Sequence, residues 1–177
     1  MNLHGLMARL YLSMVVNNLI KKPTNLRSQP MNKEEVLAYL PYTAPFLFVD
    51  ELLEIDETKV VGVYTFSASL DFYKGHFIGH PVTPGVILTE TMAQIGLVCL
   101  GIYLSASTLN SFAGQVMLTS TAIDFIKPVY SGEKVTVHAE KVYFRFNKLK
   151  CKVQMLNEKE EVVCKGTIAG MVTAKNS

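Results

Sequence analysis

The chain has 177 residues, enough for one domain with a sizeable core, and 49% of them are hydrophobic while 18% are charged. This composition excludes an intrinsically disordered protein. The net charge of +2 is unevenly distributed, because the first 33 residues carry +5 and the rest therefore carries −3. A mildly acidic body gives no indication of a nucleic-acid-binding protein.

Residues 1–31 are predicted to be a basic extension and linker that precede the folded body. The stretch 3–20 is moderately apolar, but Arg9 interrupts it and no small-residue cleavage site follows. These features argue against a secretory signal and against a membrane span. Two prolines bracket the polar linker at 23–30. We expect an accessory helix or an upstream start before Met31, with an organelle transit peptide as the alternative.

The three cysteines, Cys99, Cys151 and Cys164, include no CxxC pair. An odd number of cysteines, one of them in an apolar run, is typical of reduced thiols in a cytoplasmic protein. None has a histidine near it in the sequence, so we expect no cysteine nucleophile.

The first elements of the body are a short helix and a strand pair. Asn32 followed by Glu35 matches a capping box and predicts a helix to about Leu40, where a proline stops it. Residues 46–55 and 59–66 are rich in β-forming residues and are separated by a short polar turn. They are predicted to form an antiparallel pair.

A glycine- and proline-rich loop at 75–85 leads into an unusually apolar segment, 84–104. Pro84 is suited to a helix start, because a backbone N–H at that position would have no acceptor within the helix, so nothing is lost when proline lacks it. A helix that is apolar on every side is buried in a protein or in a membrane. Since Glu90 and Gln94 lie inside it, and a carboxylate is costly in lipid, we expect a buried central helix.

The rest of the chain is predicted to be strands. They are Gly114–Ser120, Ala122–Pro128, Glu133–Phe146, Lys148–Leu156 and Glu161–Val172. Short connections indicate antiparallel pairing, and one long buried helix beside such strands implies a curved sheet wrapped around it. The fold class is therefore α+β, and the absence of βαβ units argues against a doubly wound nucleotide-binding fold.

Two residues near the start of this helix suit acid–base chemistry. His76 lies between glycines in a loop, and an imidazole is suited to act as a general base near neutral pH. Glu90 lies inside the apolar helix, where burial favours a protonated carboxyl group. A base and a protonated acid are what an elimination across adjacent carbons requires. Taken singly, His76 reads as a loop histidine bound to backbone and Glu90 as a paired buried acid.

Two further residues would support these groups. Gln94 is four residues after Glu90 on the same helix face and could orient the carboxyl group by a hydrogen bond. Gly85 would present a backbone N–H at the helix N-terminus, which favours negative charge developing on a carbonyl oxygen.

The stretch GHFIGHPVTPGVILTETMAQ, residues 75–94, resembles the signature GHFPGxPxxPGxxxxE/DxMxQ of the FabA- and FabZ-type dehydratases. The step from His76 to the acidic residue is the same, and glutamate at 90 is similar to the FabZ branch. The segments LPYTAPFLFVD (40–50) and FIKPVYSGE (125–133) resemble further family motifs. The resemblance therefore extends over roughly residues 32–173.

This resemblance implies a hot-dog fold in a homodimer, often assembled into a hexamer, with His76 of one subunit facing Glu90 of another. His76 would remove a proton beside the thioester and Glu90 would protonate the departing hydroxyl group. The product would be a trans-2-enoyl chain on the phosphopantetheine of acyl carrier protein. The Gly85 N–H would hold the thioester oxygen and the Val82 carbonyl would orient His76.

The resemblance also implies that Gly79 and Val86 belong to the site, that the acyl chain lies in an apolar tunnel beside the helix, and that neither metal nor cofactor is required. The pathway stays open between fatty-acid synthesis and specialised polyene or pigment synthesis. The alternatives are a hot-dog acyl thioesterase and a non-catalytic acyl-binding partner.

Some positions depart from the family pattern, namely Ile78, Tyr42–Ala44 and Asp124, and none is expected to touch the catalytic pair. His80 and His138 are expected to be a loop and a surface residue. A set of basic residues is predicted to meet the acidic carrier protein or to form an ordinary solvated face. These residues are Lys127, Arg145, Lys148, Lys150 and Lys152.

Overall fold

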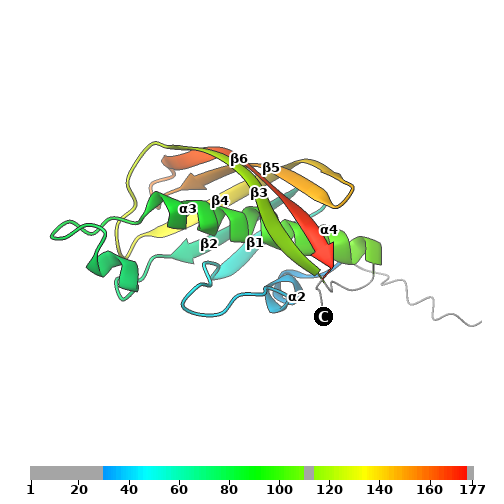
Figure 1. Cartoon of the computed structure of the whole chain (residues 1–177), viewed down its shortest axis with the longest axis horizontal. Coiled ribbons are helices and arrows are strands. Elements are labelled where there is room, and N and C mark those ends of the chain that lie inside the picture. The colour runs from blue at the N-terminus through cyan, green and yellow to red at the C-terminus, as the bar shows by residue number, and fades with distance from the viewer. Residues whose placement is uncertain (1–29, 110–113, 175–177) are drawn as a thin grey trace, which may run out of the picture.

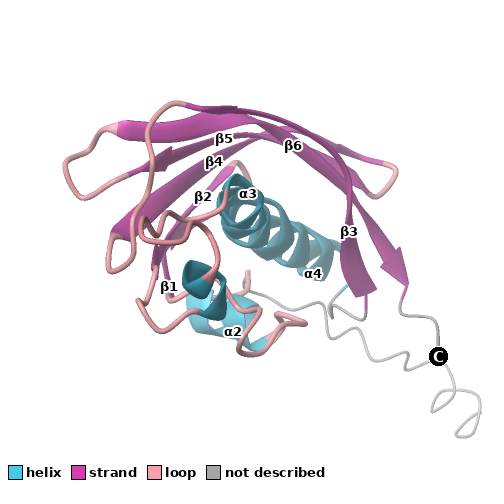
Figure 2. Cartoon of the chain, turned by 60° about the vertical axis from the view of Figure 1, so that its left-hand side comes forward, coloured by secondary structure: helices cyan, strands magenta, loops and turns pink. Residues whose placement is uncertain are grey.

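A computed structural model describes residues 30–109 and 114–174 of the chain. They form one antiparallel sheet that curves around a long central helix (Figures 1 and 2). The order of strands across the sheet is β1-β2-β4-β5-β6-β3, so β1 and β3 are its edges. The α+β, hot-dog fold class is confirmed.

The helices are α2 (Lys33–Ala38), the 3₁₀-helix η1 (Asp71–Lys74), α3 (Gly85–Ala93), the π-helical segment η2 (Gln94–Cys99) and α4 (Leu100–Leu109). The strands are β1 (Glu51–Ile55), β2 (Lys59–Thr65), β3 (Gly114–Phe125), β4 (Lys134–Arg145), β5 (Lys148–Leu156) and β6 (Val162–Ala174).

The capping box predicted at Asn32 and Glu35 is present at the start of α2. Glu35 N donates to Asn32 Oδ1 over 2.8 Å, and Asn32 N donates to Glu35 Oε2 over 2.9 Å.

The central helix runs without a break through α3, η2 and α4, and the sheet covers it. Every residue from Thr91 to Ala106 is buried. The segment Gly85–Ala106 has the length and hydropathy of a membrane span, yet 72% of its apolar window is buried inside the molecule. Its hydropathy therefore reflects its position in the core.

Close packing of the helix against the sheet depends on a small residue in the π-helical segment. A Cβ atom at Gly96 would lie 2.8 Å from Ala139 Cβ on β4 and 3.1 Å from Val153 Cγ1 on β5. A larger side chain there would force the helix away from the sheet. On the strands, inward residues such as Val135, Val137 and Leu149 are fully buried, whereas the residues between them point outward.

One predicted strand is wrong at its start. Residues 46–50 were expected to continue β1, but β1 begins only at Glu51. At residues 46–48 the backbone bonds a side chain instead of a strand, because Phe48 N donates to Gln94 Oε1 and Phe46 O accepts from Gln94 Nε2, whereas Asp50 N already donates to Val63 O of β2. The contact with Gln94 ties the segment to the central helix.

Three other boundaries differ from the expectation. The segments predicted as two strands between 114 and 128 form the single strand β3, which passes through a register shift between Leu118 and Ser120. The central helix continues to Leu109, and the helix η1 was not predicted. Predictions for residues 1–29 lie outside the described part of the chain.

Candidate active site

The loop between η1 and α3 is held in shape by its own backbone. His76 N donates to Phe72 O, and Val82 N donates to His76 O, both over 2.9 Å. Across the loop, Phe77 and His80 exchange two backbone hydrogen bonds of 3.0 and 3.1 Å. Thr83 N donates to Val129 O over 2.8 Å, which fastens the loop to the segment that follows β3. The loop is therefore closed and anchored.

The imidazole of His76 has a fixed orientation. Its Nδ1 lies 2.9 Å from the Val82 carbonyl oxygen, so the predicted contact is present. Because a carbonyl oxygen only accepts, Nδ1 carries the proton and Nε2 is left free to accept one. The ring is half-buried and stacks on Phe77 with 4.0 Å between centroids, and the peptide bond between the two residues is cis.

Glu90 is fixed by its neighbour on the same helix. Gln94 Nε2 donates to Glu90 Oε1 over 3.0 Å, so the contact predicted from their spacing is present. Gln94 is fully buried and also bonds Phe46 O and Phe48 N. These partners determine which end of the amide is nitrogen, and they leave Glu90 Oε2 free for a substrate.

Gly85 is the first residue of α3, so its N–H has no acceptor within the helix. A Cβ atom at this position would lie 3.1 Å from two ring carbons of Phe125, so a larger residue would require that ring to shift. The N–H therefore remains available at the positive end of the helix dipole. Of the other predicted site residues, Gly79 has a φ of +73° and Val86 is 74% exposed.

Several large apolar side chains near this loop are exposed. They are Phe77, Ile78, Val86, Phe125 and Ile126. Ile78, one of the departures from the family pattern, is 92% exposed. An apolar group of this kind next to polar functional residues is typical of a surface that binds an apolar ligand or another protein.

Tyr42, one of the departures from the family pattern, lies within range of the charge of Glu90. Burial, the charge of Glu90 and then Cys99 raise the pKa of Tyr42 to about 12. Tyr42 is half-buried, and its ring contacts Phe46 at 6.4 Å between centroids. It comes close to Glu90 because the segment 42–48 is bound to the helix by Gln94, a contact between residues distant in sequence.

The three cysteines are free and buried. Burial raises the pKa of both Cys151 and Cys164 to about 12, and that of Cys99 further still, so none has the thiolate character of a nucleophile. Within residues 30–109 and 114–174, no three side chains of His, Cys, Asp or Glu gather in a group that could hold a metal ion.

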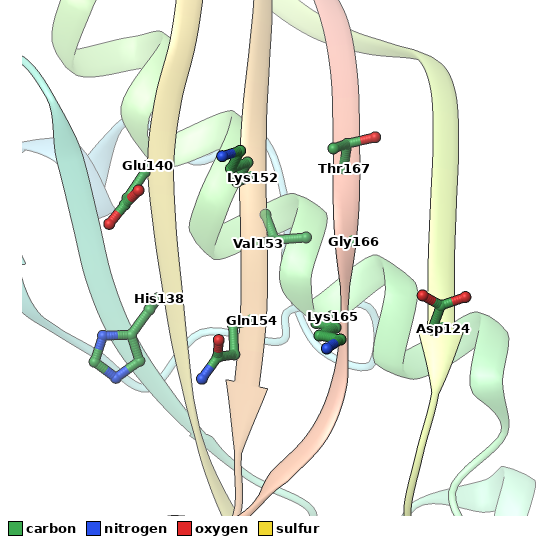
Figure 3. A pocket seen from close by; sticks show the side chains of 9 residues that line it. All are labelled: Asp124, His138, Glu140, Lys152, Val153, Gln154, Lys165, Gly166 and Thr167. Carbon is green, nitrogen blue, oxygen red and sulfur yellow. The ribbon is translucent and has the colours of Figure 1, made fainter.

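A depression of about 390 Å³ lies on the outer face of the sheet, away from these residues. Figure 3 shows the side chains that line it, with the helix behind the strands; among them are Asp124, His138, Glu140, Lys152 and Lys165. It carries both signs of charge and includes neither His76 nor Glu90. His138 is exposed, as expected.

The predicted basic set is divided by the structure. Lys148, Lys150 and Lys152 do lie on one outer face of β5. Lys127 Nζ, in contrast, pairs with Glu161 Oε1 over 2.6 Å, and Glu161 immediately precedes β6. Lys148 lies opposite Met171, near the other end of β6. At about 3.3 Å per residue these positions are roughly 30 Å apart, so they do not form one surface.

Comparisons with known proteins show the family of the chain. A family model described as a FabA-like domain matches residues 40–169. The chain is 33% identical over 145 residues to the 3-hydroxyacyl-[acyl-carrier-protein] dehydratase FabZ of Syntrophomonas wolfei, which covers 80% of this chain and 95% of that protein. The chain is a FabZ-type member of the FabA-like family. The FabZ of Acinetobacter baylyi is 33% identical over 113 residues, 64% of this chain and 76% of that one.

Solved structures support the same fold for this FabZ-type chain. The dehydratase heterocomplex ApeI:P from Xenorhabdus doucetiae superposes with a TM-score of 0.65 and 15% identity, over 83% of this chain and 93% of that one. A thioesterase from Haemophilus influenzae reaches a TM-score of 0.60 at 16% identity, over 82% and 93%. At such identities the likeness shows the hot-dog fold alone.

Proposed function

We propose that this protein dehydrates (3R)-3-hydroxyacyl chains carried on acyl carrier protein to trans-2-enoyl chains. One observation carries the proposal: a base and an acid are each held in a working orientation, His76 by the Val82 carbonyl and Glu90 by the Gln94 amide. The FabZ-type relatives named above are dehydratases of this kind.

In the first half of the reaction, His76 Nε2 takes a proton from the carbon next to the thioester. The electrons of the broken C–H bond develop negative charge on the thioester oxygen. The Gly85 N–H, at the N-terminus of α3, stabilises that charge. The Val82 carbonyl stabilises the protonated ring by accepting its Nδ1–H.

In the second half, Glu90 donates its proton to the hydroxyl group on the next carbon. The C–O bond breaks, water leaves, and the electron pair completes the double bond. The imidazole has then gained one proton and the carboxyl group has lost one, so a proton transfer between them restores the starting state. The reaction is balanced with no other reactant.

Two copies of the chain would build the complete site. Among the described residues no hydrogen bond joins His76 to Glu90, and each is held by separate contacts. The edge strand β3 is twelve residues long with mostly exposed side chains, including Met117, Leu118 and Phe125. A long unpaired edge invites pairing with another strand. We therefore place β3 of a second copy against β3, bringing His76 of one copy toward Glu90 of the other.

The deciding experiment mixes the purified protein with a 3-hydroxyacyl-carrier protein and follows the mass of the loaded carrier. Loss of one water from the carrier is the expected result. An acyl chain released from the carrier would identify a thioesterase, the second function that this fold supports. A carrier left unchanged across a series of chain lengths would contradict catalysis and favour an acyl-binding role.

A further inference from the structure

The β4–β5 hairpin concentrates positive charge in a molecule whose body is acidic. Residues 34–177 carry a net charge of −3, yet the stretch 141–152 contains five basic residues and no acidic one. The five are Lys141, Arg145, Lys148, Lys150 and Lys152. Among the residues that the structure describes, none of them forms an ion pair with a carboxylate. Their charge is therefore available to an external anionic group.

The tip of this hairpin carries an aromatic side chain in an unfavourable position. Phe146 is 96% exposed, with a φ of 50°, and Asn147 follows with a φ of 59°. Tight hairpin turns of this kind favour Asn, Asp or Gly, whereas a bulky side chain in the left-handed region is strained. Phe146 therefore has two unfavourable features, a strained backbone conformation and a phenyl ring exposed to water.

The tip is also held firmly. Asn147 O accepts a hydrogen bond from Val172 N of β6 over 2.8 Å, and Arg145 pairs with Lys148 in the strand register. The phenyl ring therefore projects from a rigid support with Arg145 and Lys148 at its base. An exposed apolar side chain flanked by two cations offers the two contributions that hold a segment at a membrane interface, apolar burial and attraction to anionic headgroups.

The hairpin lies far from the catalytic loop. Figure 1 shows the β4–β5 connection at the opposite end of the sheet from η1 and the start of α3. A carrier protein that delivers substrate must dock at the catalytic end, so this surface serves another partner. A single projecting side chain suits a fluid surface, because such a surface requires no matching pocket.

We propose that the β4–β5 hairpin docks the protein on the surface of a bilayer that contains anionic phospholipid. Phe146 enters the interface, and Arg145, Lys148 and Lys150 lie against the headgroups. The catalytic loop then faces away from the bilayer and stays open to the carrier. The inference does not depend on the proposed dehydration, and vesicle binding is measured separately from turnover.

The test is sedimentation of the full-length protein with phosphatidylglycerol–phosphatidylcholine vesicles, compared with vesicles of phosphatidylcholine alone. Phe146→Asn places a residue that tolerates positive φ at the tip, so its folding is preserved or improved while binding falls. Lys148→Glu replaces attraction by repulsion, and at about 1 kcal/mol for each charge brought near the surface we expect at least a fivefold loss. Lys159→Glu, at the exposed β5–β6 turn, is the matched control and leaves binding unchanged.

Four results would overturn the proposal. The first is equal binding of Phe146→Asn and the unmodified protein, and the second is equal binding to both kinds of vesicle. The third is a change in oligomer mass caused by Phe146→Asn, which would show that the tip contacts another copy. The fourth is displacement of the protein from vesicles by acidic carrier protein, which would assign the surface to that partner.

Discussion

At the scale of single residues, the site depends on hydrogen bonds that determine which atom is free to react. The Val82 carbonyl accepts from His76 Nδ1 and leaves Nε2 unprotonated, and the Gln94 amide occupies one oxygen of Glu90 and leaves the other. Each of the two side chains thus has one atom held by a structural hydrogen bond and one atom available for the proposed acid–base chemistry. Substitutions that remove the reactive atom while keeping the fold test these roles.

We expect His76→Ala and Glu90→Gln each to lower kcat by roughly 10²–10⁴-fold, the usual effect of losing a general base or acid. His76 is half-buried on a loop and Glu90→Gln keeps the shape of the side chain, so melting temperatures change little. Steady-state kinetics on a 3-hydroxyacyl carrier provide the measurement, and near-normal turnover of either variant would refute its assigned role.

Tyr42 should make the stability of the protein depend on alkaline pH. Burial raises its pKa in the folded state to about 12 from 10, so the unfolded chain loses this proton first as pH rises. The contribution of Tyr42 is complete below pH 10 and is lost between pH 10 and 12. Allowing for partial solvent exposure, the loss is about 1–2 kcal/mol.

Urea unfolding of the protein and of Tyr42→Phe at a series of alkaline pH values measures this difference. The variant lacks the ionising group, so its stability should decline less steeply over that interval. Other buried tyrosines and the cysteines titrate in both proteins and cancel in the comparison. Parallel curves would show that Tyr42 is solvated in the folded state.

At the scale of elements, the central helix and the 42–48 segment are joined by one buried amide. Gln94 begins the π-helical segment, and its three hydrogen bonds reach Glu90, Phe46 and Phe48. One side chain thus bonds the backbone of Phe46 and Phe48, holds Glu90, the proposed acid, and joins the segment that carries Tyr42 to the helix. The hydrogen bonds of Gln94 therefore determine both the backbone path of residues 46–48 and the position of the Glu90 carboxyl group.

Replacing Gln94 with Leu should therefore affect both stability and catalysis. The variant leaves Phe48 N and Phe46 O without their partner, and two unsatisfied polar groups cost about 2–4 kcal/mol. Chemical denaturation measures the loss, and kcat should fall because Glu90 is no longer held. Thr91→Val is the matched control, since within the described part of the chain the buried Thr91 hydroxyl bonds only Ile87 O of its own helix. Equal effects of the two variants would argue against the bridging role.

At the scale of the whole molecule, the sheet has one covered face, one solvated face and an exposed edge at β3. The apolar residues near the catalytic loop and along β3 are exposed in the single chain, whereas the outer face is charged. The surface proposed to join two copies is therefore apolar and lies along β3, whereas the basic β4–β5 hairpin is a different part of the surface. The two catalytic groups would then come from different copies.

Mixing His76→Ala with Glu90→Gln after subunit exchange tests this arrangement. If sites are shared, half of the random dimers are mixed and each contains one intact site, so activity returns to about a quarter of the unmodified level. If each site lies within one chain, the mixture stays inactive even when exchange is confirmed by mass. Activity per dimer is the quantity to measure.

The sequence by itself determined the elements that depend on local patterns. The all-round apolar run from Val86 predicts a buried helix, the segments 133–146 and 148–156 are predicted as the strands β4 and β5, and the spacing of Glu90 and Gln94 predicts their hydrogen bond. The capping box at Asn32 follows from two residues three apart. Each of these signals is carried by neighbours in the chain.

Only the tertiary structure decided where distant segments meet. The sequence of residues 46–50 favours a strand, but Gln94 bonds the backbone of Phe46 and Phe48, and the same contact brings Tyr42 within range of the charge of Glu90. Phe125 covers Gly85, and the basic residues assigned to one surface are divided between the two ends of β6. Such contacts join residues dozens of positions apart, and no local pattern encodes them.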